Sequence, residues 1–142
     1  MANYQATARS NYFAVKDETA FREWGDRCGL DILEPPHKDK VADGIRRFAI
    51  TPKGDEDSGG WPTCIADDET DDYVDIDLPK ELSAHLVANE VAVLMEIGSE
   101  KLRYITGVAV AINHKGRHVR MDLNSIYLAA TRLGSGITRA EY

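Results

Sequence analysis

Residues 90–113 read EVAVLMEIGSEKLRYITGVAVAIN, two apolar runs separated by a short polar stretch. Because β-branched residues, which favour strands, recur in both runs, we predict one strand at Glu90–Ile97 and another at Arg103–Asn113. The residues NHKG at 113–116 predict a turn into a third strand at Arg117–Leu123. Three antiparallel strands in a row, a meander, are therefore predicted at the centre of the fold.

The rest of the chain predicts further strands and three helices. Runs of aromatic, aliphatic and β-branched residues predict strands at 10–15, 30–33, 46–51 and 73–78. A helix is predicted to begin after Asp17 and to end at Gly29, a second to begin at Pro79, and a third to follow Asn124 as its cap. Together these elements predict an α+β fold, a mostly antiparallel, twisted sheet of five to seven strands with two or three helices packed on one face.

Alternation of apolar and polar residues predicts which side chains of two strands face the core. The residues expected to point inward are Val74, Ile76 and Leu78 in one strand and Val119, Met121 and Leu123 in the other. Those expected to point outward are Asp75 and Asp77, and His118, Arg120 and Asp122. In the last predicted helix, Ile126, Ala130 and Leu133 form one apolar stripe.

Length and composition predict a single domain over residues 1–142. The chain has a mass of 15.8 kDa and 43% hydrophobic residues, which excludes collagen-like, mucin-like and wholly disordered classes. The sequence KGDEDSGGWPT at 53–63 predicts an acidic, mobile loop. The first ten residues lack the pattern of an export signal, and no apolar run is long enough to cross a membrane. Cys28 and Cys64 have no CxxC spacing, so reduced thiols and a cytoplasmic location are expected.

The formal net charge of −7 conceals two regions of opposite sign. Residues 55–81 carry one lysine against eleven Asp and Glu residues, whereas residues 101–142 carry seven Lys and Arg residues against two acids. An acidic middle and a basic end therefore distinguish this chain from one with evenly mixed charges.

The acidic region is open to three interpretations. It could be a solvated surface that keeps the protein in solution, or an oxygen-rich cation site, although the Ca²⁺-loop spacing is absent. The third interpretation is a row of carboxylates that imitates phosphates and occupies a cationic groove in a nucleic-acid-binding protein. The residues predicted to bind such a partner are Asp55, Glu56, Asp57, Asp67, Asp68, Glu69, Asp71, Asp72, Asp75 and Asp77, with Trp61 as an apolar anchor.

The basic end predicts a different contact. His114, Lys115, Arg117, His118 and Arg120 lie at or beside the predicted turn. They could form a polar hairpin tip, or they could dock against the acidic segment of a second copy and make a homodimer. Direct binding of nucleic acid by this chain is not expected, because the acidic region would repel the same polyanion.

No pattern of catalytic strength occurs in the sequence. Gly59 and Gly60 are not followed by the lysine and hydroxyl residue of a phosphate loop, and neither GxSxG nor HExxH is present. Cys64 could act as a nucleophile in a small hydrolase if a histidine lay nearby in space, but a structural cysteine is the simpler interpretation. We therefore predict no catalytic residue, no metal ligand and no cofactor.

The opening ANYQATARSNYFAVKDETAF, the stretch at 90–113 and the closing DLNSIYLAATRLG resemble small uncharacterised proteins that bacterial phages, plasmids and integrative elements carry. The resemblance implies a mobile-element setting, in which small acidic inhibitors of anti-CRISPR and anti-restriction type are common. The predicted function is therefore a non-enzymatic, acidic inhibitor of a nucleic-acid-handling host defence protein, such as a nuclease or an effector complex. A self-associating regulatory or scaffold module of a mobile element is the alternative, followed by the cysteine-dependent hydrolase.

Overall fold

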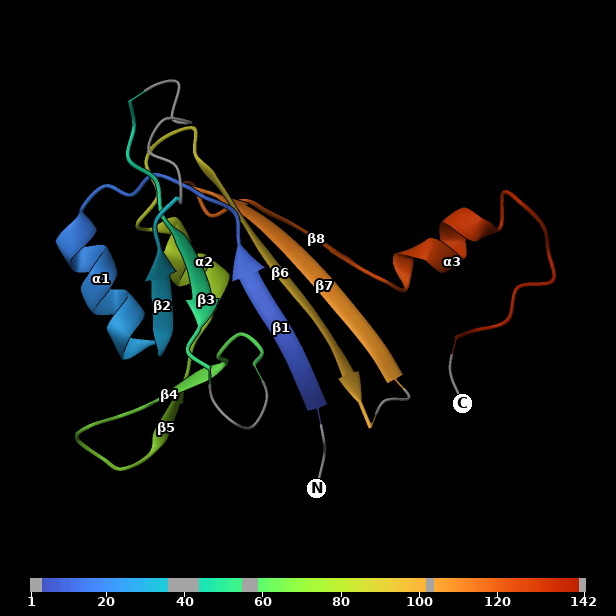
Figure 1. The fold of residues 1–142 in the computed structure, drawn as a ribbon, viewed down its shortest axis with the longest axis horizontal. Coiled ribbons are helices and arrows are strands. Elements are labelled where there is room, and N and C mark those ends of the chain that lie inside the picture. Colours follow the sequence, from blue (N-terminus) through green and yellow to red (C-terminus); the bar gives the residue numbers. More distant parts are fainter. Residues whose placement is uncertain (1–3, 36–43, 55–58, 102–103, 141–142) are drawn as a thin grey trace.

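A computed structural model of the chain describes residues 4–35, 44–54, 59–101 and 104–140 (Figure 1). These residues form eight strands and three helices, in the order β1 (Tyr4–Ser10), α1 (Glu18–Arg27), β2 (Leu30–Leu33), β3 (Ala49–Pro52), β4 (Cys64–Ala66), β5 (Tyr73–Asp75), α2 (Leu78–Ser83), β6 (Val91–Glu100), β7 (Tyr104–Asn113), β8 (His118–Asp122) and α3 (Ser125–Ala130). Every described strand pair is antiparallel. The predicted α+β class is confirmed. None of the described helices is both long enough and apolar enough to span a membrane.

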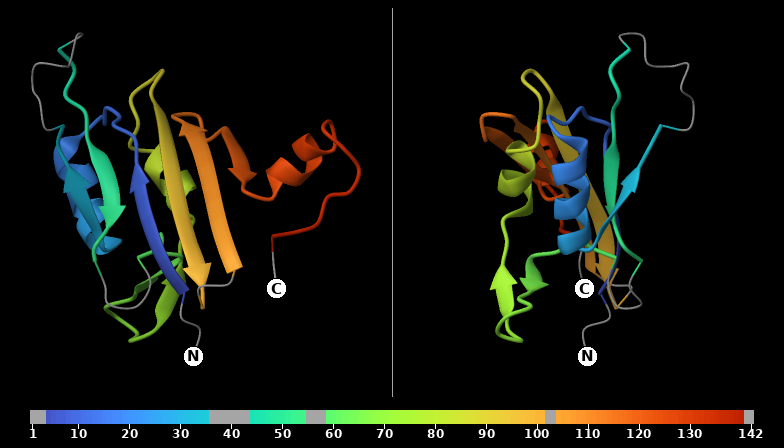
Figure 2. Two further views of the ribbon diagram at one scale, coloured as in Figure 1. Left: turned by 45° about the vertical axis from the view of Figure 1, so that its right-hand side comes forward. Right: turned by 90° about the vertical axis from the view of Figure 1, so that its left-hand side faces the viewer.

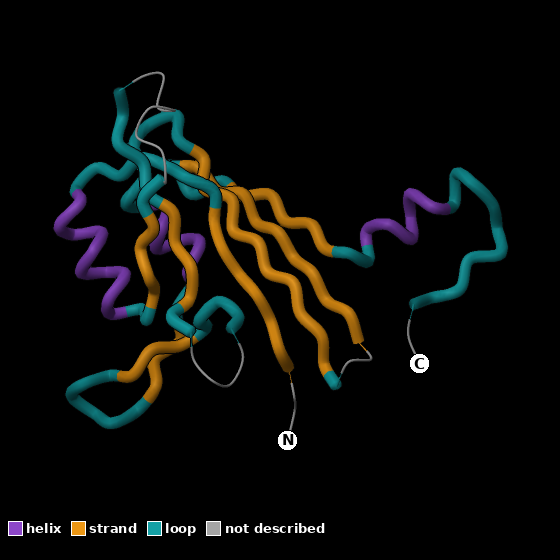
Figure 3. Tube along the Cα trace, viewed as in Figure 1, coloured by secondary structure: helices purple, strands orange, loops and turns teal. Residues whose placement is uncertain are grey.

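The predicted meander forms most of the main sheet, whose strand order in the described residues is β1-β6-β7-β8 (Figure 3). β6 and β7 pair along their full length, from Val91 opposite Asn113 to Glu100 opposite Tyr104. β1 adds to the far side of β6, with Tyr4 opposite Glu100. Of the strand predicted at 10–15, Ser10 lies in β1, which begins earlier in the chain, and Phe13 and Val15 form isolated bridges.

The other described strands form two separate hairpins, so the single sheet of five to seven strands is divided. β2 and β3 lie beside β1 but are joined to it by side chains rather than by a backbone ladder. The Ile50 backbone N–H donates to the buried Ser10 hydroxyl at 2.8 Å, and the Thr51 hydroxyl donates to the Ala8 carbonyl at 2.8 Å. β4 and β5 form the second hairpin, and the sequence pattern does not predict β4.

The core lies against one face of the main sheet, here called the inner face, which carries Ala92, Leu94 and Ile112. Helices α1 and α2 cover this face with side chains that are almost wholly buried: Phe21, Trp24, Leu78 and Leu82. The opposite, outer face is covered by no described helix. The helices predicted from Asp17 and Pro79 therefore pack as expected.

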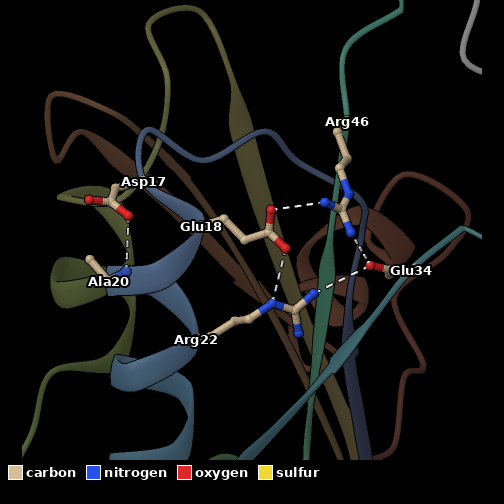
Figure 4. A network of polar contacts seen from close by, with 6 residues as sticks. All are labelled: Asp17, Glu18, Ala20, Arg22, Glu34 and Arg46. Carbon is tan, nitrogen blue, oxygen red and sulfur yellow. Dashed lines mark hydrogen bonds and ion pairs between the residues drawn. The ribbon is translucent and has the colours of Figure 1, made fainter.

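Helix α1 begins and ends where its sequence predicts. The Asp17 carboxylate accepts a hydrogen bond from the Ala20 backbone N–H at 3.1 Å, and Gly29, with φ of 71°, stops the helix. A chain of ion pairs then joins the exposed side of α1 to the segment around the β2–β3 hairpin (Figure 4). Glu18 contacts Arg22 and Arg46, and both arginines reach Glu34.

The C-terminal part of the fold corrects three predictions. Val119 and Met121 are 72% and 62% exposed on the outer face, while His118 and Arg120 lie on the inner face beside α2. Asn124 precedes α3 but makes no side-chain capping bond. Helix α3 does not pack on the sheet, and Figures 1 and 2 show it standing away from the other elements. Val119 and Met121 stay exposed because α1 and α2 cover only the inner face, and these two side chains of β8 point to the outer face.

Phe21 is the side chain on which the core most depends. It is fully buried, and its ring lies 5.8 Å from Phe13, 5.9 Å from Trp24 and 6.0 Å from Phe48. We expect Phe21→Ala to lower the free energy of unfolding by about 3–5 kcal/mol, because it leaves a cavity among rings that cannot all move inward. Urea denaturation measures this, and Tyr73→Ala at a 75% exposed position should change the value by less than about 0.5 kcal/mol.

His85 makes the stability depend on pH. Its ring packs 5.2 Å from Trp24, and burial, followed by the nearby Arg27 charge, lowers its pKa below the ordinary value of 6.5. The folded state then binds fewer protons than the unfolded chain, so the stabilisation is present above pH 6.5 and is lost as pH falls toward the folded pKa. We expect His85→Phe, which keeps a ring in place, to flatten the melting temperature between about pH 5 and 7 relative to wild type. Parallel curves for the two proteins would contradict this.

Candidate functional site

Most of the predicted acidic surface lies on the β4–β5 hairpin and its turn, residues 64–75, here called the acidic hairpin. The hairpin is closed at its tip by the Asp67 backbone N–H, which donates to the Asp72 carbonyl at 2.7 Å. The Asp67 carboxylate also accepts hydrogen bonds from the Glu69 N–H and the Thr70 hydroxyl, each at 3.0 Å. Asp71 has a φ of 56°, a turn conformation that Asp and Asn tolerate better than most residues. The turn is thus held by its own polar groups.

The carboxylates of the acidic hairpin point into solvent. The exposed ones are Asp68, Glu69, Asp71, Asp72 and Asp75, and Asp67 is half-buried. Among the residues that the structure describes, none of these six forms an ion pair with a lysine, arginine or histidine. Figures 1 and 2 show the hairpin extending from the body of the molecule. The sequence-predicted acids at 67–75 are therefore brought together on one projecting element.

The base of the acidic hairpin is attached to the core. Ile65 and Ile76 pack against the buried cluster, and the Ile76 N–H donates to the Thr63 carbonyl at 2.9 Å. Asp77 then caps α2 by accepting from the Lys80 N–H at 3.2 Å, so this predicted partner-binding residue has a structural role as well. Val74, predicted to point inward, is 48% exposed, because β5 extends beyond the inner face.

The remaining predicted partner contacts differ in position. Asp55, Glu56 and Asp57, which are all the acids of the predicted mobile loop, lie outside the described residues. Trp61 is half-buried, packs against the core, and its indole N–H donates to the Met95 carbonyl at 3.2 Å. This arrangement joins the loop to the sheet, so Trp61 is separate from the acidic hairpin.

Glu96 is a second anchor of the same loop, and no sequence motif identifies it. Its carboxylate accepts from the Trp61 backbone N–H at 2.6 Å and from the Tyr4 hydroxyl at 2.7 Å, and burial is the main cause of the raised pKa of Tyr4. Gly59 approaches β1 so closely that a Cβ there would lie 2.1 Å from the Ala6 carbonyl oxygen. The alternation of β6 could have identified Glu96, because it shares the inner face with Ala92 and Leu94.

The basic residues predicted for self-association do not form one exposed tip. The Asn113 side chain accepts from the Lys115 and Arg117 backbone N–H groups, both at 3.0 Å, and so fixes the turn. His118 and Arg120 line a hollow of about 450 Å³ with Asp77, Lys80 and Lys115, among others. His114 is half-buried, and its Nδ1 has no hydrogen-bond partner in the described part of the chain. These five residues are thus divided between a turn and a concave surface.

Both cysteines are free thiols, in opposite environments. Cys28 is buried at the end of α1, and burial raises the pKa of its thiol. Cys64 is exposed on β4 opposite Asp75, so it does not have the partly buried position expected of a structural cysteine. In the described ranges, no three His, Cys, Asp or Glu side chains are grouped so that they could hold a metal ion.

The two thiols should react very differently. We expect iodoacetamide to alkylate Cys64 in the native protein and Cys28 only after denaturation, because the thiolate of Cys28 is disfavoured and shielded. Peptide mass spectrometry after timed labelling measures both rates, with Cys64→Ser as the control. Equal native rates at the two sites would contradict the described packing of α1.

Known proteins suggest no function for the acidic hairpin. Comparison of the chain with protein-family models, with curated proteins and with solved structures finds no match. A function for this chain has therefore to be inferred from its own charged and apolar surfaces.

Proposed function

We propose that the protein is a non-enzymatic inhibitor whose acidic hairpin occupies the phosphate-binding groove of a nucleic-acid-handling protein. The target class is a host defence nuclease or effector complex, of the kind that anti-CRISPR and anti-restriction proteins block, and this part of the proposal comes from the resemblance of the sequence to mobile-element proteins. The observation that carries the proposal is the gathering of six carboxylates, without cationic partners among the described residues, on one projecting element.

The charge density of the acidic hairpin supports this comparison with nucleic acid. Extended strands rise about 3.3 Å per residue, so the carboxylates from Asp75 to the tip lie within roughly 15 Å of hairpin length. Six charges over that length give about one per 2–3 Å, between the 1.7 Å spacing of duplex DNA and the 3.4 Å spacing of one strand. A groove that binds phosphates would therefore meet a similar line of negative charge.

The local structure also supports a recognition role. A hairpin whose turn is held by Asp67 and whose base packs on the core through Ile65 and Ile76 loses little conformational entropy when it binds. Carboxylates without ion-pair partners need give up only water to contact a cationic groove. Their unscreened field would also increase the rate of association with such a target at low salt.

A variant with four charges removed tests the proposal. Asp68→Asn, Asp71→Asn, Asp72→Asn and Asp75→Asn nearly keep side-chain shape, and they leave Asp67 and Asp77, which hold the turn and cap α2, in place. In affinity capture from a bacterial lysate at about 0.1 M salt, we expect this variant to bind the captured partner at least about tenfold more weakly than wild type. Duplex DNA should displace the partner from wild type.

A matched control removes the same charge elsewhere. Glu23→Gln, Asp26→Asn, Asp31→Asn and Glu100→Gln also take away four charges, but from α1, β2 and the end of β6. This control should retain the partner and the same decline of affinity with salt as wild type. Equal loss in both variants, or a partner that duplex DNA does not displace, would rule out phosphate mimicry by the acidic hairpin.

A further inference from the structure

The outer face of the main sheet carries an apolar surface that no described element covers. Its exposed side chains are Met95 and Ile97 on β6, Ile105 on β7, Val119 and Met121 on β8, and Leu123 directly after β8, with exposed fractions between 50% and 72%. The strand register places Met95, Ala109 and Met121 in one row across three strands. Leu123 lies over Gly107, where an added Cβ would come within 2.8 Å of its side chain. The surface is therefore continuous across β6, β7 and β8.

This face is as large as the largest apolar patches found on ordinary monomers. Exposed fractions of this size on six Met, Ile, Val and Leu side chains correspond to roughly 600 Å², the upper end of the largest patch on a typical monomeric protein. In sheets covered on one side, the free face normally carries polar residues. Here β7 instead contributes Gly107, Ala109 and Ala111, and the larger apolar side chains of β6 and β8 flank them. The small residues of β7 and the larger apolar side chains of β6 and β8 on either side, on strands about 10 Å apart, are here called the furrow.

The residues that follow this face are also apolar and uncovered. Residues 124–140, here called the C-terminal arm, contain α3 and a tail that returns to it: the Ala140 N–H donates to the Tyr127 hydroxyl at 2.6 Å. Ile126, Leu128 and Leu133 in the arm are 63%, 79% and 93% exposed. A six-residue helix is too short to be stable in water without tertiary contacts, so α3 needs a surface to pack against.

The arm does not reach the outer face of its own sheet. The Leu123 N–H still donates to the Gly107 carbonyl at 3.0 Å, and the turn into α3 starts at once with hydrogen bonds from Ile126 to Leu123 and from Tyr127 to Asn124. Only Leu123 and Asn124 separate β8 from α3, and both are held by these hydrogen bonds. Figures 1 and 2 show that the arm consequently leaves the β8 edge and points away from the main sheet.

We propose that two copies of this chain form a dimer by exchanging their arms, with α3 of each copy packed on the outer face of the other. The same chain supplies this apolar furrow and an apolar helix that cannot reach its own furrow. Reciprocal exchange closes after two copies, as a twofold axis requires. Both contacts together offer on the order of 1,000 Å² of apolar surface per copy, whereas a stable interface buries about 800 Å² per partner.

The dimer is independent of the function proposed above. The acidic hairpin and the arm lie at opposite ends of the molecule in Figure 1, so arm exchange would leave both acidic hairpins accessible. Loss of dimerisation would therefore not remove the acidic surface, and the four-charge variant of the acidic hairpin should still form the dimer.

Sedimentation equilibrium tests the proposal. At about 50 μM we expect wild type to have twice the 15.8 kDa mass of the chain, and Ile126→Ser, Leu128→Ser and Leu133→Ser together to give a monomer. Removal of residues 124–142 should have the same effect. All three side chains are exposed, so the circular dichroism of the main sheet should be unchanged. Val74→Ser, at an exposed apolar position on the acidic hairpin, is the matched control and should remain dimeric.

Mixing two defective chains separates arm exchange from other dimers. Met95→Lys with Met121→Lys blocks the furrow but keeps the arm, and the triple serine variant keeps the furrow but lacks an apolar arm. Each variant alone should be monomeric, and the mixture should form a one-to-one heterodimer with one intact contact, at least about tenfold weaker than wild type. A monomeric wild type, a triple serine variant that remains dimeric, or a mixture without heterodimer would overturn the proposal.

Discussion

The full-length pairing of β6 with β7 is the constraint on which the rest of the structure depends. Since successive side chains of a strand point to opposite faces, the register from Val91–Asn113 to Glu100–Tyr104 decides at once which residues meet α1 and α2. Ala92, Leu94 and Ile112 join the core, Glu96 becomes an acceptor for the loop at Trp61, and Met95 and Ile97 are left on the outer face. A shift by one residue would exchange all of these roles.

The elements with local signals are the ones that the sequence predicts well. Asp17 and Gly29 bound α1, Pro79 lies in the first turn of α2, and the turn at 113–116 joins β7 to β8, because caps and turns act within a few residues. The faces to which the side chains of β8 point are predicted wrongly for a different reason. Alternation separates two faces but does not say which of them the helices cover, and α1 and α2 lie on the face opposite Val119 and Met121.

The candidate site divides in the same way. The acidic residues at 67–75 are consecutive enough in sequence to lie together on any short hairpin, so their gathering follows from composition. Trp61 and the basic residues depend on distant partners, such as Met95 for the indole and α2 for His118 and Arg120, and composition does not specify those contacts. The order of charges along the chain thus predicts a surface formed by residues that are close in sequence. It does not predict the position of residues whose contacts depend on the main sheet.

The edge of the sheet at β8 has a consequence for higher assembly. Within the described chain β8 has a strand neighbour on only one side, so its other backbone edge could template further strands and grow into fibrils. Arg117 directly precedes this short strand and Arg120 lies in it, paired with Asp122, and charged side chains at an edge oppose its pairing with a second edge. The charged residues near β8 therefore oppose polymerisation through this edge, and this effect of the basic end requires no bound ligand.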